Sequence, residues 1–228
     1  MQARLSPEGA LGLHLTLGIF ILTGAAWLFG AILEDVVTGD PLTVLDLRIA
    51  VWLHAHATPS LTRIMVFISY LGTSAVTGAI AVVVGFALWR WRYPYRLLAL
   101  ALAVPGGMLL NVLIKYAVHR PRPIFDHPLV ALATYSFPSG HALASTVLYG
   151  LLAAFAVWTS KDRRWRMLAV VIAAVLIALV CFSRIYLGVH YLSDVLGGIA
   201  EGVAWLALCV TAVETFRRHR ASRNSSPE

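Results

Sequence analysis

The chain has 228 residues, of which 59% are hydrophobic and only 13% are charged, and its mean hydropathy is +0.78. Its length would allow one or two soluble domains, but this composition excludes a soluble globular domain and favours a membrane protein. The net charge of +7 could suggest nucleic-acid binding, so the positions of the basic residues must be considered first. Both cysteines, Cys181 and Cys209, lie in apolar runs, where we expect buried thiols and no disulfide framework.

Six apolar runs predict six transmembrane helices, because about 20 helical residues at roughly 1.5 Å each cross a bilayer core. The predicted spans are residues 11–33, 62–89, 97–118, 141–159, 167–182 and 194–216. The first run is longer than the apolar core of a secretory signal, about 7–15 residues, so we expect it to be retained. The predicted fold class is therefore all-α, a polytopic membrane protein with a single domain over residues 1–228. Residues 217–228 form a basic tail that we expect to be disordered.

The stretch between the first two spans, residues 34–58, carries four acids but also apolar residues at helical spacing. The spaced positions are Leu45, Ile49, Trp52, Leu53 and His56. This pattern favours an amphipathic helix that lies in the membrane interface, where Trp is frequent. An ordered loop with one helical turn is the alternative. We interpret His54 and His56 as residues of this helix.

The basic residues are distributed unevenly between the two ends of the predicted spans. Twelve of the eighteen Lys and Arg residues lie in the N-terminus, in residues 90–96 and 161–166, and in the tail. The positive-inside rule places both termini and these turns in the cytoplasm, and the other loops in the periplasm or outside the cell. We therefore interpret the net positive charge as a sign of the topology in the cytoplasmic membrane and of affinity for anionic lipid. We expect no nucleic-acid partner, and no obligate protein partner is evident.

Three polar stretches stand at the predicted outer ends of the spans. Residues 115–123 read KYAVHRPRP, residues 138–141 read PSGH, and residues 183–194 begin with SR and end with a His and an Asp four positions apart. Ionisable residues at membrane depth are costly, so such a cluster is a candidate functional site. Cations that hold phosphoryl oxygens, one imidazole that attacks and another that donates a proton are typical of phosphoryl transfer.

The pattern K-x(6)-R-P, P-S-G-H and S-R-x(5)-H-x(3)-D resembles the signature of the type 2 phosphatidic acid phosphatases. These are integral-membrane lipid phosphatases that share an active-site architecture with vanadium haloperoxidases. All three blocks are complete and in order in this chain. The resemblance implies that His190 is the nucleophile that becomes phosphohistidine, that Asp194 orients it, and that His141 protonates the departing oxygen.

A second group of motif residues is expected to bind phosphate. These residues are Lys115, Arg122, Ser139, Gly140 and Arg184. Ammonium and guanidinium groups match phosphoryl oxygens and stabilise the charge of the transition state, and the open backbone N–H groups at a helix start attract anions. The motifs contain one carboxylate and no pair with two-metal spacing, so we predict no metal and no other cofactor.

Three other arginines, Arg48, Arg63 and Arg120, are interpreted as side chains that snorkel to the headgroup region. Three further polar residues remain open. Glu201 either anchors the bundle or bridges to a cation on another helix. Asp126 and His127 either contact the substrate headgroup or form a solvated turn.

The sequence therefore predicts a lipid phosphatase that removes the terminal phosphate of a lipid phosphate or diphosphate at the outer membrane face. The resemblance implies undecaprenyl diphosphate, phosphatidylglycerol phosphate or phosphatidic acid as substrate, and an outward-facing site favours the first. A lipid phosphotransferase that uses the same histidine is an alternative. So is a non-enzymatic transporter or binding protein, although the internal repeats of many transporters are absent here.

Overall fold

The computed structural model describes residues 12–39, 41–126, 128–130 and 134–224. These residues form eight helices and no strand, which confirms the predicted all-α fold. The helices are α1 (Leu13–Thr38), α2 (Pro41–Ala55), α3 (Pro59–Tyr70), α4 (Ser74–Arg90), α5 (Pro94–Val118), α6 (Gly140–Thr159), α7 (Arg163–Tyr186) and α8 (Leu192–Asn224).

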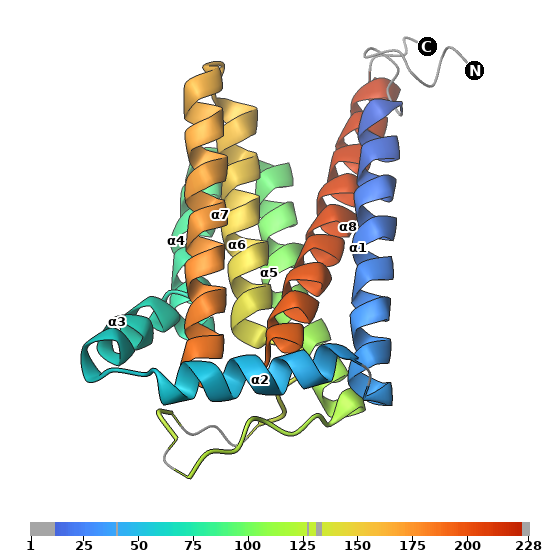
Figure 1. Cartoon of the computed structure of the whole chain (residues 1–228). Coiled ribbons are helices and arrows are strands. Elements are labelled where there is room, and N and C mark those ends of the chain that lie inside the picture. Colours follow the sequence, from blue (N-terminus) through green and yellow to red (C-terminus); the bar gives the residue numbers. More distant parts are fainter. Residues whose placement is uncertain (1–11, 40, 127, 131–133, 225–228) are drawn as a thin grey trace.

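Five of these helices, α1, α5, α6, α7 and α8, are long and apolar enough to cross a membrane, and α3 with α4 would make a sixth span. Figure 1 shows α1 and α4 to α8 running along one common direction, with α2 lying across one end of the bundle. The helix α6 is central, since eleven of its 20 residues are buried. Its buried aliphatic side chains pack against those of α4, α5 and α8. The start of α6 is therefore held rigidly at the end of the bundle where α2 lies.

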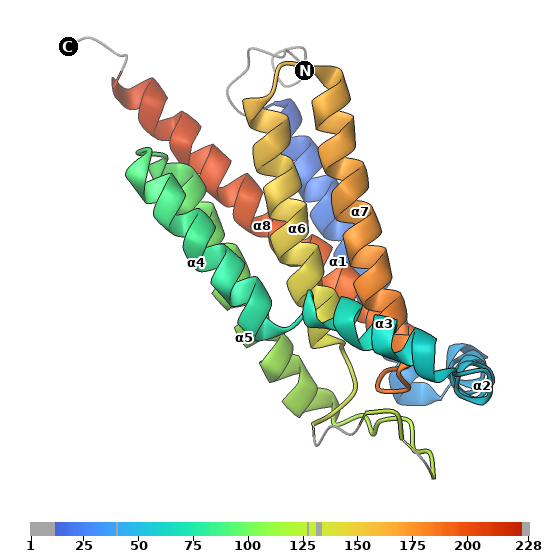
Figure 2. The same ribbon diagram turned by 90° about the vertical axis from the view of Figure 1, so that its left-hand side faces the viewer.

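The predicted second span is divided into α3 and α4 by a turn at residues 71–73, with a bend of 40° between the two helices. Figure 2 shows α3 turned away from the direction of α4. The Thr73 side chain accepts a hydrogen bond from the Val76 N–H and caps α4. Gly72 allows the turn to pass close to α6 and α7, because a Cβ there would lie 2.4 Å from Val180. The hydrophobicity of the sequence did not predict this break between α3 and α4.

The helices α7 and α8 extend beyond the predicted spans. The Asp162 carboxylate caps the Arg164 N–H at 2.8 Å, so α7 starts at Arg163, and it continues to Tyr186 where a loop was expected from residue 183. The expected disorder of the tail is wrong for residues 217–224, which belong to α8. The last four residues of the expected tail, 225–228, lie outside the described residues.

The amphipathic stretch before the second span does form a helix, α2, but its buried face differs from the expected one. Asp46 and Ala50 are each 1% exposed, whereas Leu45 and Trp52 are 45% and 60% exposed. Asp46 is buried because Arg120 and α8 bind its carboxylate, so the helix is rotated to present an acid inward. The location of α2 in the membrane interface stays a prediction.

Candidate active site

The three sequence motifs meet at the end of the bundle where α2 lies. Lys115 is in the last turn of α5, residues 138–141 lead into α6, Arg184 is in the last turn of α7, and Asp194 is in the first turn of α8. Figures 1 and 2 both show these four helix ends on the same side of the molecule. The connection between α5 and α6 passes beneath them and contributes Arg122.

His190 and Asp194 form a buried pair, as their spacing predicts. The His190 Nδ1 lies 3.4 Å from the Asp194 carboxylate, and the two residues are 1% and 0% exposed. His190 itself precedes α8, so the contact does not require a continuous helix. The same carboxylate accepts a hydrogen bond of 2.9 Å from the Tyr191 N–H and one of 2.5 Å from Arg120. These contacts hold the carboxylate beside the imidazole in one orientation.

The other nitrogen of His190 faces a guanidinium group. Nη1 of Arg122 lies 3.2 Å from the His190 Nε2. A guanidinium can only donate, so Nε2 accepts with its lone pair and the ring proton resides on Nδ1, facing Asp194. Burial lowers the pKa of His190 to about 3, the cations Arg122 and Arg184 act in the same direction, and Asp194 opposes them. The imidazole is therefore neutral at neutral pH.

Arg122 is fixed by four further hydrogen bonds. It donates to the carbonyls of Thr134, Tyr135 and Val189 at 2.6, 3.1 and 2.5 Å, and to the Thr134 hydroxyl at 2.9 Å. These partners lie in the loop before α6 and in the loop before α8. The guanidinium therefore ties the two loops together while one edge remains against His190.

Lys115 binds the loop that leads into α6. Its ammonium donates to the carbonyls of Tyr135, Ser136 and Pro138 at 3.0, 3.3 and 2.6 Å. An ammonium has three donors, so a phosphoryl oxygen would have to replace one of these carbonyls. The contacts place the charge next to the start of α6, as the motif assignment requires.

Arg184 is buried, with 4% of its surface exposed. One Nη donates to the Ser69 hydroxyl of α3 at 2.5 Å, while its Nε has no hydrogen-bond partner among the described residues. Buried guanidinium nitrogens are rarely left without a partner. This donor is consequently available for an anionic ligand. The contact with Ser69 could not be found from the sequence, because 115 residues separate the two positions.

The PSGH motif forms the start of α6. Ser139 is the N-cap, with its hydroxyl accepting from the Ala142 N–H, and its own N–H donates to the Asp194 carbonyl at 2.9 Å. Ser139 is fully buried, so its hydroxyl is engaged in capping. His141, in the first turn, is partly exposed and lies within electrostatic range of Arg184, His190, Arg122 and Lys115. The structure thus brings both histidines and all three motif cations into one cluster.

The interpretation of Arg120 as a snorkelling side chain is wrong. Its guanidinium is 10% exposed, donates to Asp194 at 2.5 Å and to Asp46 at 2.9 Å, and lies over the Tyr191 ring. Asp46 also accepts from the Ser193 N–H at 2.9 Å and from the Ser193 hydroxyl. Arg48 and Arg63, in contrast, are exposed.

A sequence signal for Asp46 did exist. Asp46 stands four and seven residues before Ala50 and Leu53, which are 1% and 9% exposed, and thus shares their helix face. No comparable signal linked this acid to Arg120, since 74 residues separate them.

The residues left open by the sequence have different outcomes. Glu201 is buried and accepts a hydrogen bond of 2.8 Å from the Asn111 amide, which joins α8 to α5. Asp126 is exposed, and His127 lies outside the described residues. The His54 ring stacks on the Phe125 ring with a centroid distance of 4.1 Å.

Residues 94–218, which include all three motifs, match the PAP2 superfamily. The chain belongs to this superfamily. Phosphatidylglycerophosphatase B of Bacillus subtilis is 34% identical over 166 residues, which are 71% of this chain and 80% of that protein. An undecaprenyl-diphosphatase of Sulfolobus acidocaldarius is 29% identical over 163 residues, or 68% of this chain and 72% of that protein.

The fold is similar to that of a solved relative. The crystal structure of a transmembrane PAP2-type phosphatidylglycerolphosphate phosphatase from Bacillus subtilis superposes with a TM-score of 0.73 and 26% identity, and the match covers 91% of this chain and 98% of that chain. The PAP2 chain described here is therefore a multi-pass membrane protein and a phosphatase.

Proposed function

We propose that this PAP2 phosphatase hydrolyses the terminal phosphate of a lipid phosphate or diphosphate through a phosphohistidine at His190. The observation that carries the proposal is the environment of His190. Its Nδ1 proton is held by Asp194, and the lone pair of its Nε2 faces the Arg122 guanidinium. A phosphoryl group drawn to Arg122 would therefore arrive directly in front of a neutral imidazole nitrogen, the form that can attack.

The first chemical step is attack of the His190 Nε2 on the terminal phosphorus. An N–P bond forms, the bond from phosphorus to the leaving oxygen breaks, and His141 gives a proton to that oxygen, its protonated form being stabilised by the negative charge of the bound phosphoryl group. Positive charge develops on the His190 ring, where the buried Asp194 carboxylate stabilises it. In the second step neutral His141 takes a proton from water, the resulting oxygen attacks phosphorus, and His190 leaves as neutral imidazole.

The cations stabilise the charge that the phosphoryl oxygens gain in both transition states. Arg184 offers its unpartnered Nε, Arg122 the edge beside His190, and Lys115 an ammonium at the start of α6. Gly140 contributes a backbone N–H at the positive end of the α6 dipole. Ser139 supports this position as the N-cap.

Metal ions have no assigned role in this scheme. The two carboxylates closest to the site, Asp46 and Asp194, are already bound to Arg120, Ser193 and backbone N–H groups. We therefore expect phosphate release to be unchanged by an excess of EDTA. The measurement is the initial rate of the purified protein with and without the chelator. Loss of activity that added Mg²⁺ or Zn²⁺ restores would contradict the scheme.

We further propose that the site faces the periplasm or cell exterior of the cytoplasmic membrane, with both termini in the cytoplasm. The uneven distribution of Lys and Arg supports this orientation. The motif residues at the ends of α5 to α8 would then hold a headgroup phosphate at the membrane surface while the lipid tail stays between helices and bilayer. An outward-facing site suits a carrier lipid that is released on the outside, so undecaprenyl diphosphate is our first candidate.

The test is phosphate release from undecaprenyl diphosphate, phosphatidylglycerol phosphate and phosphatidic acid by the detergent-purified protein. His190→Ala, checked for folding by its thermal unfolding curve, is the matched control. We expect the highest kcat/KM with the diphosphate and no release by the variant. Preference for a glycerophospholipid would indicate that the protein acts in phospholipid metabolism instead. Wild-type activity of His190→Ala would contradict the mechanism for every substrate.

A further inference from the structure

A cavity lies at the end of the bundle opposite to the active-site cluster. It has a volume of about 810 Å³ and is enclosed by the beginnings of α1 and α5, the end of α6 and the last part of α8. Arg96, which lines the cavity, lies near the start of α5, whereas Lys115 of the active-site cluster lies near the end of the same helix. These 19 residues of helix correspond to about 28 Å. The two sites are therefore separated by most of the thickness of a bilayer core.

One wall of this cavity is apolar. Its aliphatic lining residues include Leu15, Leu17, Ile21, Ala99, Val210 and Val213. The helices α1 and α8 approach closely beside it, since a Cβ on Gly18 would lie 2.0 Å from the Thr211 hydroxyl oxygen. Their side chains thus form a continuous apolar surface of the kind that accommodates an acyl chain.

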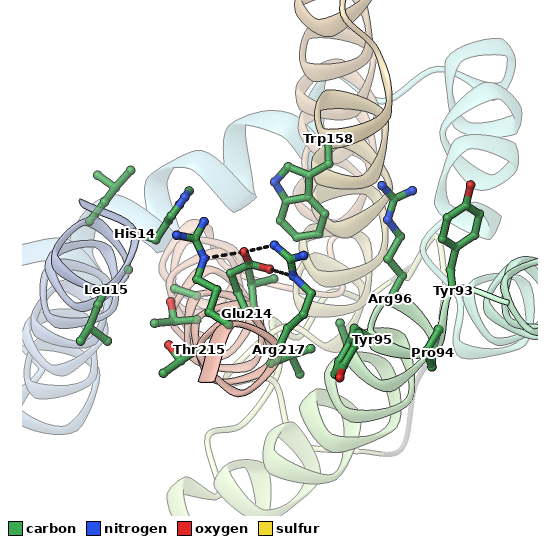
Figure 3. A pocket seen from close by; sticks show the side chains of 18 of the residues that line it. His14, Leu15, Tyr93, Pro94, Tyr95, Arg96, Trp158, Glu214, Thr215 and Arg217 are labelled. Carbon is green, nitrogen blue, oxygen red and sulfur yellow. Dashed lines mark hydrogen bonds and ion pairs between the residues drawn. The ribbon is translucent and has the colours of Figure 1, made fainter. Parts of the chain in front are cut away.

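The rim of the cavity is strongly cationic. It carries four arginines, Arg92, Arg96, Arg217 and Arg218, but one carboxylate, Glu214, among its described lining residues. The lining therefore has a formal charge of +3, four positive minus one negative, with His14 neutral. In Figure 3 the Glu214 carboxylate is drawn with dashed lines to two guanidinium groups. These are its ion pairs with Arg217 and Arg218 at 2.6 and 2.8 Å.

Arg96 has no carboxylate partner among the described residues. It donates to the neutral Thr159 hydroxyl at 2.8 Å and lies 4.9 Å from the centroid of the Tyr93 ring. Figure 3 shows Arg96, Arg217 and Trp158 among the side chains that line the cavity. Cations and amphipathic aromatic rings beside an apolar wall match the headgroup boundary of a bilayer.

We propose that this cavity binds one anionic phospholipid from the leaflet opposite to the active site. The phosphate accepts hydrogen bonds from Arg96 and Arg92, neither of which has an ion pair with a described carboxylate, and an acyl chain lies along the α1–α8 wall. A soluble anion would leave the apolar wall uncovered, and a neutral lipid would leave the guanidinium groups without a counter-charge. This inference does not depend on the identity of the substrate.

The experiment is a lipid titration of the full chain, delipidated in a neutral detergent. The probe is phosphatidylserine, an anionic phosphodiester without a terminal phosphate, and phosphatidylcholine and inorganic phosphate are titrated in parallel. Bound lipid is counted by native mass spectrometry, and the rise in melting temperature is recorded. We expect one retained phosphatidylserine, with neither comparison ligand stabilising the protein.

Three variants localise the bound lipid. In Arg92→Gln/Arg96→Gln the affinity should fall roughly 25-fold, about fivefold for each cation near the membrane surface. Arg163→Gln/Arg164→Gln removes the same charge at the same end of the bundle but outside the cavity, and should bind as the wild type does. Lys115→Gln removes a cation of the active-site cluster and should also leave the affinity unchanged.

Each contrary result overturns the proposal. Equal losses in both arginine pairs would indicate general surface attraction, and loss in Lys115→Gln would place the lipid in the active site. Equal binding of phosphatidylcholine would show that the cations do not select the lipid. Equal stabilisation by inorganic phosphate would show that the apolar wall does not contribute to binding. If the Arg92→Gln/Arg96→Gln protein does not fold, Arg92→Gln alone, at an exposed residue that lines the cavity, should lower the affinity about fivefold.

Discussion

At the scale of single residues, the site depends on how His190 is held. The ring is buried between a carboxylate on Nδ1 and a guanidinium on Nε2. The contact with Asp194 selects the tautomer that carries the proton on Nδ1. The contact with Arg122 holds a cation beside Nε2, where it would attract a phosphoryl group. Because burial lowers the pKa of His190 to about 3, Nε2, the proposed nucleophile, stays unprotonated over the physiological pH range.

The lowered pKa of His190 predicts a pH dependence of stability. In the unfolded chain the group has a pKa of about 6.5, so the unfolded state binds the proton first as the pH falls. The contribution of the neutral ring to the free energy of unfolding is complete above about pH 6.5 and decreases as the pH falls toward 3. His190→Gln cannot take up this proton.

The measurement is the melting temperature of the wild type and of His190→Gln in the same detergent between pH 7.5 and 5. We expect the wild-type value minus the variant value to decrease as the pH falls. A constant or increasing difference would show that His190 is not held neutral by burial.

The sequence could predict which residues gather in this cluster but not their supporting contacts. Fixed motif spacing identified both histidines, Asp194 and the three cations, because such chemistry needs those residue types. The buried network of Asp46, Arg120 and Ser193 escaped detection because its members are separated by 73 or more residues. Only packing of α2 against the start of α8 brings them together.

At the scale of elements, the helix α2 links the loop before α6 to the start of α8 and so stabilises the site. Its Asp46 carboxylate binds Arg120 from the loop before α6, and the Ser193 N–H at the start of α8. Asp194, one residue further, holds both Arg120 and His190. The position of the nucleophile is thus coupled to a helix that carries none of the three motifs.

We expect Asp46→Asn to lower the free energy of unfolding by about 1–3 kcal/mol, because buried donors of Arg120 and Ser193 lose a charged acceptor. The thermal unfolding of the purified variant measures this loss. Glu34→Gln, an exposed change near the end of α1, is the control and should stay within about 0.5 kcal/mol of the wild type. Equal stability of both variants would argue against a bracing role for α2.

The limits of the elements were harder to predict than their existence. Apolar runs located the five helices that are long and apolar enough to cross a membrane. Hydropathy did not predict the turn at residues 71–73, where Gly72 packs tightly. Hydropathy also did not predict the last turn of α7, where the charged Arg184 is buried as part of the helix. The end of α8 was missed because Arg217 and Arg218 reinforce the helix through Glu214, one turn earlier.

At the scale of the whole molecule, the two ends of the bundle have different chemistry. One end gathers the three sequence motifs beside α2, and the other carries the basic turns and the cationic cavity. Under the positive-inside rule this asymmetry supports the proposed orientation of the chain in the membrane.

Cysteine accessibility tests the proposed orientation. Cys181 and Cys209 are buried, and we would replace them with alanine first. In that background a cysteine in place of Ile124, which is 92% exposed in the loop near the site, should react with a membrane-impermeant maleimide in intact cells. A cysteine in place of Trp165, 64% exposed at the start of α7, should react only after permeabilisation. The reverse pattern would invert the proposed topology.

The most direct test of the central claim is to trap the phosphoenzyme. The purified protein would be mixed with a lipid substrate radiolabelled in its terminal phosphate, quenched in alkali within milliseconds, and separated from lipid by denaturing electrophoresis. We expect label on the wild-type chain that survives alkali, is lost in acid, as a phosphorus–nitrogen bond is, and is absent from His190→Ala. Label that persists in His190→Ala, or an acid-stable label on the wild type, would contradict a phosphohistidine at His190.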